Sequence, residues 1–296
     1  MVHTPVLPDL SGRVIVITGG NSGIGKEAAV TLARSGATVA ITARDAQRGR
    51  DALAEIQQRS GSDNVEVVSL DLADFASIRS AAADVLDRFD RLDVLVNNAG
   101  LVLRHRQETV QGFEMTFGVN HLGHFLLTDL LEARLIESAP ARVVVVASDA
   151  HKFARKGIDF DDLQSERSYG QFGFDAYGKT KLENVLFSNE LARRLAGTGV
   201  TSNALHPGFV ASNFARQGDG GRMGEIGMVL LRPFATSPEK ASATTSYLAG
   251  SNDVVERTGE YWVRCAPTMP TAMAQSEEIA ARLWETSEAL IAESGA

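Results

Sequence analysis

Apolar and polar positions follow two different periods along this chain. Short, mainly apolar runs rich in β-branched residues predict strands at 14–17, 37–42, 65–70, 92–96, 142–147, 200–205 and 259–263. Segments with an apolar stripe of helical period predict helices at 25–35, 46–59, 75–89, 112–131, 176–196, 238–248 and 276–291. Strands that alternate with helices pair in parallel through right-handed crossovers. We therefore predict an α/β fold with a doubly wound, mostly parallel sheet in a single domain.

The stretch 209–234 departs from both periods, because glycines are interleaved there with large apolar residues. This composition favours a mobile substrate lid over an apolar pocket, although a loosely packed connector has the same pattern. No repeat or linker divides the chain, so one domain over 1–296 is expected.

The first predicted strand is followed at once by a glycine turn, RVIVITGGNSGIG at 13–25. Glycines let the backbone approach a phosphate, and the N–H groups and dipole of the following helix favour its negative charge. A plain strand-to-helix turn can also need glycines, so the turn alone is weak evidence. The residues at the ends of the predicted strands strengthen the evidence for a nucleotide site. Ligands of doubly wound sheets bind at the carboxyl ends of the strands, where the sequence places Thr18, Arg44, Asp71 and Asn97.

Composition argues against several other classes of protein. The net charge is −8 and no run of Lys and Arg occurs, which argues against a nucleic-acid-binding surface. Cys265 is the sole cysteine, so no intrachain disulfide can form, and a packed thiol is expected there. The N-terminus does not resemble a signal peptide, and no apolar run approaches the roughly 18 residues of a membrane span. We expect a soluble, cytoplasmic protein without a membrane or nucleic-acid partner.

Tyr177 and Lys181 lie four residues apart at the start of a predicted helix, so their side chains share one face. A random pair of this kind is usually an exposed aromatic beside a solvated lysine. Here the preceding strand delivers Ser148 to the same sheet edge, and its context VVASDAH lacks the Gly-x-Ser-x-Gly elbow of acyl transfer. An ammonium can lower a tyrosine pKa from near 10 by roughly 1–3 units, towards the range of efficient acid–base catalysis. With a serine to hold the substrate oxygen, this pattern points to hydride transfer beside a nicotinamide.

Several motifs occur in the order of the short-chain dehydrogenase/reductase family and closely resemble it: TGGNSGIG at 18–25, NNAG at 97–100, Asn120, Ser148, YGKTK at 177–181 and HPGFVAS at 206–212. Further segments resemble its retinol dehydrogenase-like branch: ITARD at 41–45, VNHLGHF at 119–125 and GKTKLENVLF at 178–187. The resemblance covers nearly the whole chain and implies a Rossmann-type fold. It also implies a catalytic tetrad of Asn120, Ser148, Tyr177 and Lys181. In the family the tyrosine is the acid/base, the lysine lowers its pKa and holds the ribose, and the asparagine supports a water in the proton relay.

The same resemblance implies where a nicotinamide cofactor binds. The phosphates would lie on the glycine turn, the adenine beside 71–72, the ribose by 98–99 and the carboxamide by 207–210. The contacts implied are Gly19, Asn21, Ser22, Gly23, Ile24, Gly25, Asp71, Leu72, Asn98, Ala99, Gly100, Tyr177, Lys181, Pro207, Gly208 and Val210.

The end of the second strand bears on the choice of cofactor. An acidic residue there accepts a hydrogen bond from the ribose 2′-OH of NAD, whereas an arginine accommodates the 2′-phosphate of NADP. The chain has Arg44, with Asp45 one step later, and arginine pairs bidentately with phosphate. We therefore predict NADP(H) in preference to NAD(H). The alternative is that Arg44 only caps the following turn.

The sequence says less about the substrate. The segment between Ser148 and Tyr177 is longer than in compact family members, and its apolar residues could line the pocket or only cover the sheet edge. Membrane-anchored retinol enzymes carry an apolar N-terminal segment that this sequence lacks, so retinol itself is not implied. The composition of the expected lid favours a small apolar ketone, aldehyde or alcohol.

Two other functions stay open at this point. One is a catalytically silent, NADP(H)-binding regulatory protein, against which the complete tetrad argues. The other is an epimerase of the extended branch, which shares Tyr-x-x-x-Lys but differs in its glycine spacing. His121 and His124 lie on one predicted helix without a companion ligand, so no metal site is expected. A homodimer or homotetramer is common in the family, and a monomer is not excluded.

Overall fold

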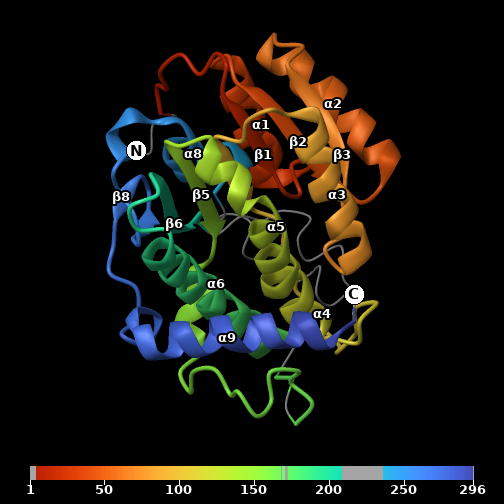
Figure 1. Ribbon diagram of the computed structural model, residues 1–296, viewed down its shortest axis with the longest axis vertical. Coiled ribbons are helices and arrows are strands. Elements are labelled where there is room, and N and C mark those ends of the chain that lie inside the picture. Colours follow the sequence, from red (N-terminus) through yellow and green to blue (C-terminus); the bar gives the residue numbers. More distant parts are fainter. Residues whose placement is uncertain (1–4, 168, 171–172, 209–235, 296) are drawn as a thin grey trace.

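Eight strands form one sheet in the order β3-β2-β1-β4-β5-β6-β7-β8 in the computed structural model, which describes residues 5–167, 169–170, 173–208 and 236–295 (Figure 1). Neighbouring strands are parallel except for the antiparallel β7–β8 pair. The predicted doubly wound, mostly parallel sheet is confirmed. The strands are β1 (Val14–Ile17), β2 (Thr38–Ala43), β3 (Val65–Ser69), β4 (Val94–Asn97), β5 (Ala141–Val146), β6 (Val200–His206), β7 (Tyr261–Val263) and β8 (Ala266–Pro267).

Helices cover both faces of this sheet. Side chains of α3, α5, α6 and α9 share one hydrophobic cluster with the sheet, and those of α1, α2 and α8 share a second cluster. Along β1, Val16 belongs to the first cluster while Ile15 and Ile17 belong to the second, as expected for a strand buried on both faces. The helices are α1 (Gly23–Arg34), α2 (Ala46–Ser60), α3 (Phe75–Arg88), α4 (Met115–Phe117), α5 (Gly123–Glu137), α6 (Phe174–Arg194), α8 (Pro238–Gly250) and α9 (Glu277–Glu293).

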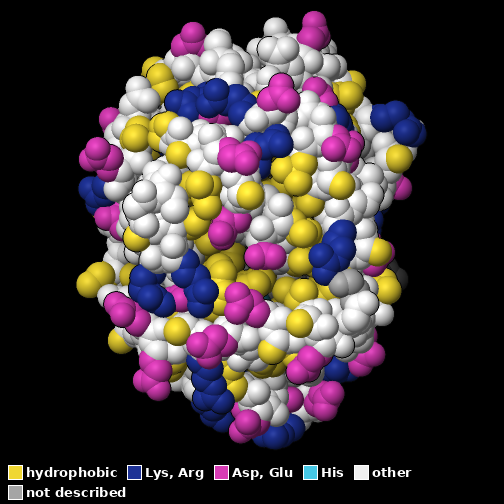
Figure 2. Space-filling model, in the orientation of Figure 1, with side chains coloured by type: hydrophobic (Ala, Val, Ile, Leu, Met, Phe, Trp, Pro, Cys, Tyr) yellow, Lys and Arg dark blue, Asp and Glu magenta, His cyan; other side chains and the backbone are white. Residues whose placement is uncertain are grey.

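The C-terminal helix α9 runs across α6 and reaches α5 (Figure 1). The indole of Trp284 lies between two phenylalanines, with ring centroids 4.7 Å from Phe125 and 5.7 Å from Phe187. On this face apolar side chains gather near the centre, with acidic side chains among them (Figure 2).

The helix predicted at 112–131 differs from the observed one in its bounds and in its geometry. Gly112 has a left-handed φ of 82°, and the helix begins only at Met115, where the Glu114 carboxylate accepts hydrogen bonds from the N–H groups of Thr116 and Phe117. A π-helical turn, Gly118–Leu122, then joins α4 to α5. Such a turn holds one extra residue and is frequent at functional sites. An apolar period of 3.6 residues cannot reveal it.

Strand β8 was not predicted. It pairs with β7 through a two-residue turn in which Arg264 and Cys265 have φ values of 54° and 60°. Glycine and asparagine are the usual residues in such turns, so Arg-Cys gives no turn signal in the sequence. The lid predicted at 209–234 lies outside the described residues.

Candidate active site

The glycine turn leaves the first turn of α1 without a side-chain cap. Ser22 is the N-cap residue, yet its side chain makes no capping hydrogen bond, and no acidic residue occupies the first turn. A Cβ on Gly25 would lie 2.5 Å from Asn98 Nδ2 and 3.0 Å from the carbonyl oxygen of Gly19, so only glycine fits there. This cradle of free N–H groups suits the diphosphate of a dinucleotide. The helices α2, α3, α8 and α9 are instead capped by Asp45, Asp74, Ser237 and Ser276.

Thr18 fastens the glycine turn to the residues after β4. Its Oγ1 accepts hydrogen bonds from the N–H groups of Asn98 at 2.8 Å and Ala99 at 2.9 Å. The side-chain amide of Asn98 donates to the carbonyl oxygen of Thr18 at 2.7 Å. Asn98 and Ala99 therefore lie beside the expected phosphate site, and their contact with a ribose stays a prediction.

Asn120 lies in the π-helical turn and is completely buried. Its side chain pairs with the main chain of Leu101, accepting from the N–H at 2.8 Å and donating to the carbonyl at 2.9 Å. It also donates to Thr180 Oγ1 at 3.1 Å. A Cβ on Gly100 would lie 3.2 Å from Asn120 Oδ1 and 3.6 Å from Lys181 Nζ. The amide thus ties the loop after β4 to α6, next to the predicted catalytic lysine.

Ser148, Tyr177 and Lys181 meet at the carboxyl end of β5. The Ser148 hydroxyl is hydrogen-bonded to the Tyr177 phenol, and its Oγ accepts from the N–H of Ala150 at 3.1 Å. Lys181 Nζ lies 5.5 Å from the centroid of the Tyr177 ring and donates to the carbonyl of Val146 at 2.9 Å. The four side chains of the predicted tetrad therefore lie at one edge of the sheet. Their catalytic roles stay predictions.

Burial dominates the protonation of this pair. It raises the pKa of Tyr177 to about 12, against a smaller lowering by the hydrogen bond from Ser148. It lowers the pKa of Lys181 to about 7. Burial therefore outweighs the Ser148 hydrogen bond in the protein by itself, and a lowering of the tyrosine pKa by the neighbouring lysine stays a prediction.

Two histidines hold the peptide that carries Ser148. His151 Nδ1 donates to the carbonyl oxygen of Ser148 at 2.7 Å, and the N–H of Asp149 donates to His206 Nδ1 at 3.2 Å. The sequence indicated no contact of this kind for His206. A bond between β6 and the end of β5 depends on tertiary packing, so no local motif reports it.

The remaining predicted cofactor residues lie at the same sheet edge or outside the described residues. The Asp71 carboxylate accepts from the N–H of Ala73 at 3.0 Å. The Leu72 side chain is buried in the hydrophobic cluster of α5, so only its main chain can face an adenine. Pro207 and Gly208 follow β6 directly, with Gly208 at a φ of 96°. Val210 lies outside the described residues.

A buried carboxyl that the sequence did not single out lies two residues after the predicted catalytic lysine. Glu183 on α6 is 2% exposed, and among the described residues no hydrogen-bond partner is found for its Oε2. Burial raises the pKa of Glu183 to about 8, with Lys179 lowering it and Glu114 raising it further. The carboxyl is therefore mostly neutral at pH 7.

No group of three or more His, Cys, Asp or Glu side chains in the part of the chain described here is placed to hold a metal ion. No helix within these residues is both long and apolar enough to cross a membrane.

Comparisons with known proteins agree with this architecture. The model of the family described as "short chain dehydrogenase" matches residues 13–159. Retinol dehydrogenase 12 of Mus musculus is 44% identical over 278 residues, which cover 94% of this chain and 86% of that protein. Retinol dehydrogenase 14 of Mus musculus is 42% identical over 301 residues, covering 95% of this chain and 86% of that protein.

Solved structures show the same fold. An uncharacterised protein from Mycobacterium paratuberculosis superimposes with a TM-score of 0.75 at 34% identity, covering 96% of this chain and 95% of that one. The NADP active-site complex of RhlG from Pseudomonas aeruginosa has a TM-score of 0.68 at 29% identity, covering 86% of this chain and 94% of that one. Members of the family bind a nicotinamide cofactor, and the residues of the glycine turn fit one. The chain belongs to the short-chain dehydrogenase/reductase family of oxidoreductases, in its retinol dehydrogenase-like branch.

Proposed function

We propose that this protein is an NADP(H)-dependent carbonyl reductase or alcohol dehydrogenase that interconverts an apolar ketone or aldehyde and its alcohol. The observation that carries the proposal is the meeting of Ser148, Tyr177 and Lys181 at the sheet edge that also holds the uncapped start of α1. When bound, the cofactor supplies or accepts the hydride. The protein's own part is then to hold the substrate oxygen and to move one proton.

The proton chemistry follows from the contacts. In reduction, the Ser148 hydroxyl holds the carbonyl oxygen and the Tyr177 phenol gives it a proton. A phenol with a pKa of about 12 is protonated at neutral pH, which is the form that reduction requires. The tyrosinate that remains lies next to the Lys181 ammonium, which stabilises its charge until a proton returns.

An apolar substrate is supported by two exposed aromatic side chains in the segment between Ser148 and Tyr177 and by the relatives. Phe153, five residues after Ser148, is 66% exposed, and Phe174, the first residue of α6, is 56% exposed. Two relatives are named retinol dehydrogenases, so retinal belongs in the substrate panel. The test measures NADPH oxidation with retinal and other apolar carbonyl compounds against sugars and charged oxo acids. Turnover confined to sugars or charged acids would contradict the proposed substrate class.

The alternatives predict different outcomes in the same assay. A silent regulatory protein binds NADPH but oxidises none of the compounds. An epimerase converts a sugar nucleotide without net consumption of cofactor. The cytoplasmic location and the homodimer or homotetramer stay predictions.

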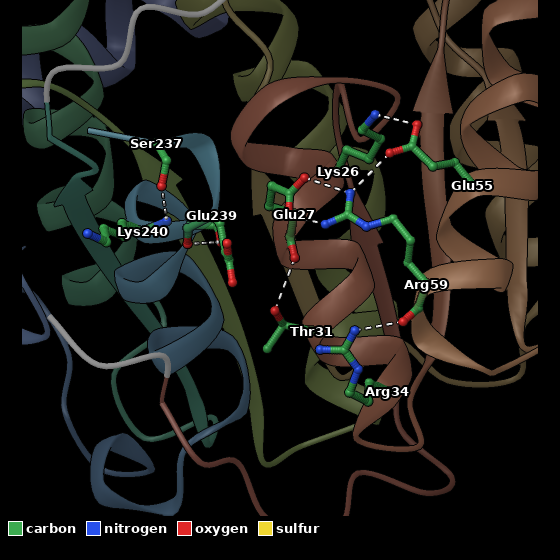
Figure 3. A network of polar contacts seen from close by, with 10 residues as sticks. Lys26, Glu27, Thr31, Arg34, Glu55, Arg59, Ser237, Glu239 and Lys240 are labelled. Atoms are coloured by element: carbon green, nitrogen blue, oxygen red, sulfur yellow. Dashed lines mark hydrogen bonds and ion pairs between the residues drawn. The ribbon is translucent and has the colours of Figure 1, made fainter. Parts of the chain in front are cut away.

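The preference for NADP(H) rests on which charged groups near the glycine turn are already paired. Asp45, the acidic residue near the end of β2, caps α2 by accepting from the N–H of Arg48 at 2.8 Å. Lys26 pairs with Glu55 at 2.6 Å in the network between α1 and α2 (Figure 3). Arg44 is exposed, and among the described residues no hydrogen bond or ion pair is found for its side chain. Arg44 is therefore available to a 2′-phosphate, while Asp45 is engaged by the helix.

Replacement of this arginine should change the choice of cofactor. We expect Arg44→Asp to weaken NADPH binding by about 10- to 100-fold, because a charge-assisted pair is lost and a like charge is introduced. NADH binding should be unchanged or tighter. Fluorescence titration of both reduced cofactors checks this, with Arg50→Asp on the following helix α2 as the control. A wild-type protein that prefers NADH would contradict the prediction.

A further inference from the structure

His124 occupies a place in the fold that no sequence argument assigned to it. It lies on α5, one turn after Asn120, and is 3% exposed. One ring nitrogen, Nε2, lies 2.8 Å from Thr18 Oγ1, and the other, Nδ1, lies 3.2 Å from the carbonyl oxygen of Asn120. The ring thus touches both the residue before the glycine turn and the main chain of the π-helical turn.

The hydrogen bonds determine the tautomer of this ring. A carbonyl oxygen can only accept, so Nδ1 carries the proton that goes to Asn120. The Thr18 hydroxyl accepts from the N–H groups of Asn98 and Ala99, and of the two acceptors for its own proton, His124 Nε2 at 2.8 Å is nearer than the carbonyl oxygen of Val96 at 3.3 Å. A neutral imidazole satisfies this arrangement. Burial keeps it neutral: together with a smaller effect of the charge of Lys181, and against the hydrogen bond to Asn120, it lowers the pKa of His124 to about 4.

The carbonyl oxygen of Asn120, which accepts from His124, also accepts a hydrogen bond from a second side chain. With its amide oriented so that both its atoms find partners, Asn184 on α6 donates to the carbonyl oxygens of Asn120 at 2.9 Å and of Thr180 at 3.1 Å. The side chain of Asn120 holds Leu101 and Thr180 at the same time. A shift of this turn would therefore move the loop after β4 and the helix that carries the tyrosine and lysine.

We propose that His124 is a positioning residue that couples the glycine turn, through Thr18, to the π-helical turn of Asn120. The inference deepens the proposed function. It rests on that function only where its test measures kcat. Through this ring, the conformation of the glycine turn affects the π-helical turn of Asn120, and through it the position of Tyr177 and Lys181 on α6.

Two substitutions distinguish the hydrogen bond to Thr18 from the hydrogen bond to Asn120. In His124→Asn, the shorter amide keeps a donor at the place of Nδ1 and loses the acceptor for Thr18. In His124→Gln, the longer amide keeps an acceptor at the place of Nε2 and loses the donor for Asn120. We expect His124→Asn to weaken cofactor binding about tenfold with kcat within twofold of the wild type. We expect His124→Gln to lower kcat about tenfold with cofactor affinity within twofold.

His121, three residues before His124 in the π-helical turn, provides a matched control. It is also buried, with its Nε2 2.8 Å from Ser287 Oγ, and it contacts α9 rather than the site. His121→Asn and His121→Gln should change the melting temperature without splitting affinity from turnover. Equal losses in both His124 variants, or the same losses in the His121 variants, would overturn the proposal.

A wild-type protein without turnover would refute the proposed function and not this inference. The positioning role of His124 is then tested by cofactor affinity alone, measured with the more tightly bound of NADPH and NADH. In that case His124→Asn must bind more weakly than His124→Gln, and Thr18→Val must cost less affinity in the His124→Asn protein than in the wild type. Additive losses from these two substitutions would overturn the coupling.

Discussion

Tyr177→Phe is expected to lower kcat by about 10²- to 10⁴-fold, because it removes the hydroxyl proposed to exchange a proton with the substrate oxygen. The phenyl ring remains, so its packing over Lys181 is kept. The hydrogen bond with Ser148 is lost, but the serine still accepts from the N–H of Ala150 and keeps its rotamer. Cofactor affinity should change by less than about tenfold, since the glycine turn is untouched. NADPH oxidation under saturating cofactor and carbonyl compound measures the effect.

Tyr247→Phe is the matched control for this substitution. The hydroxyl of Tyr247 donates to Asp253 at 3.2 Å at the end of α8, on the other face of the sheet. Its loss should leave kcat within twofold. A Tyr177→Phe protein that keeps more than a tenth of wild-type turnover would mean that another group moves the proton, and the assignment of the acid/base would be wrong.

The sequence predicted the layers of this fold well because they depend on local periods. The strand predicted at 14–17 and the helix predicted at 46–59 show their apolar period whichever element packs against them. The period and the length of the segment therefore identify each of them. The strand order also placed Ser148 at the carboxyl edge of the sheet, since parallel strands end on the same side, and the next predicted helix opened with Tyr177. The motif resemblance and the strand order therefore gave the same site.

What the sequence could not predict depends on contacts between distant segments. The hydrogen bond between His124 and Thr18 joins residues more than a hundred positions apart, and the π-helical turn that exposes Asn120 to Leu101 leaves the apolar stripe intact. The sequence also could not predict how strongly burial shifts the pKa values of Lys181 and Tyr177. Charge pairs can be anticipated from spacing, whereas desolvation depends on how completely other elements cover the pair.

Lys181 should make the stability of the cofactor-free protein depend on pH. Its pKa in the folded protein is about 7, below the ordinary value of 10.5, because the ammonium is buried. Between these two pH values the unfolded chain holds a proton that the folded chain lacks, so the free energy of unfolding rises with pH. The buried carboxyl of Glu183 acts with the opposite sign, since its pKa of about 8 lies above its ordinary 4.5. Its contribution is lost as pH rises towards 8, so the window from pH 8 to 10 isolates the lysine.

In that window the wild type should gain about 3 kcal/mol of unfolding free energy relative to Lys181→Met, at roughly 1.4 kcal/mol for each pH unit. Methionine is close to lysine in length and carries no charge, so it fills the same space without titrating. Urea unfolding of both proteins at pH 8, 9 and 10, without added cofactor, measures the difference, and Glu183→Gln should keep the wild-type slope there. Parallel curves for the wild type and Lys181→Met would show that the lysine keeps its ammonium in the fold. In that case the charge would lie next to Tyr177 throughout the neutral range, and it could lower the phenol pKa as the family resemblance implies.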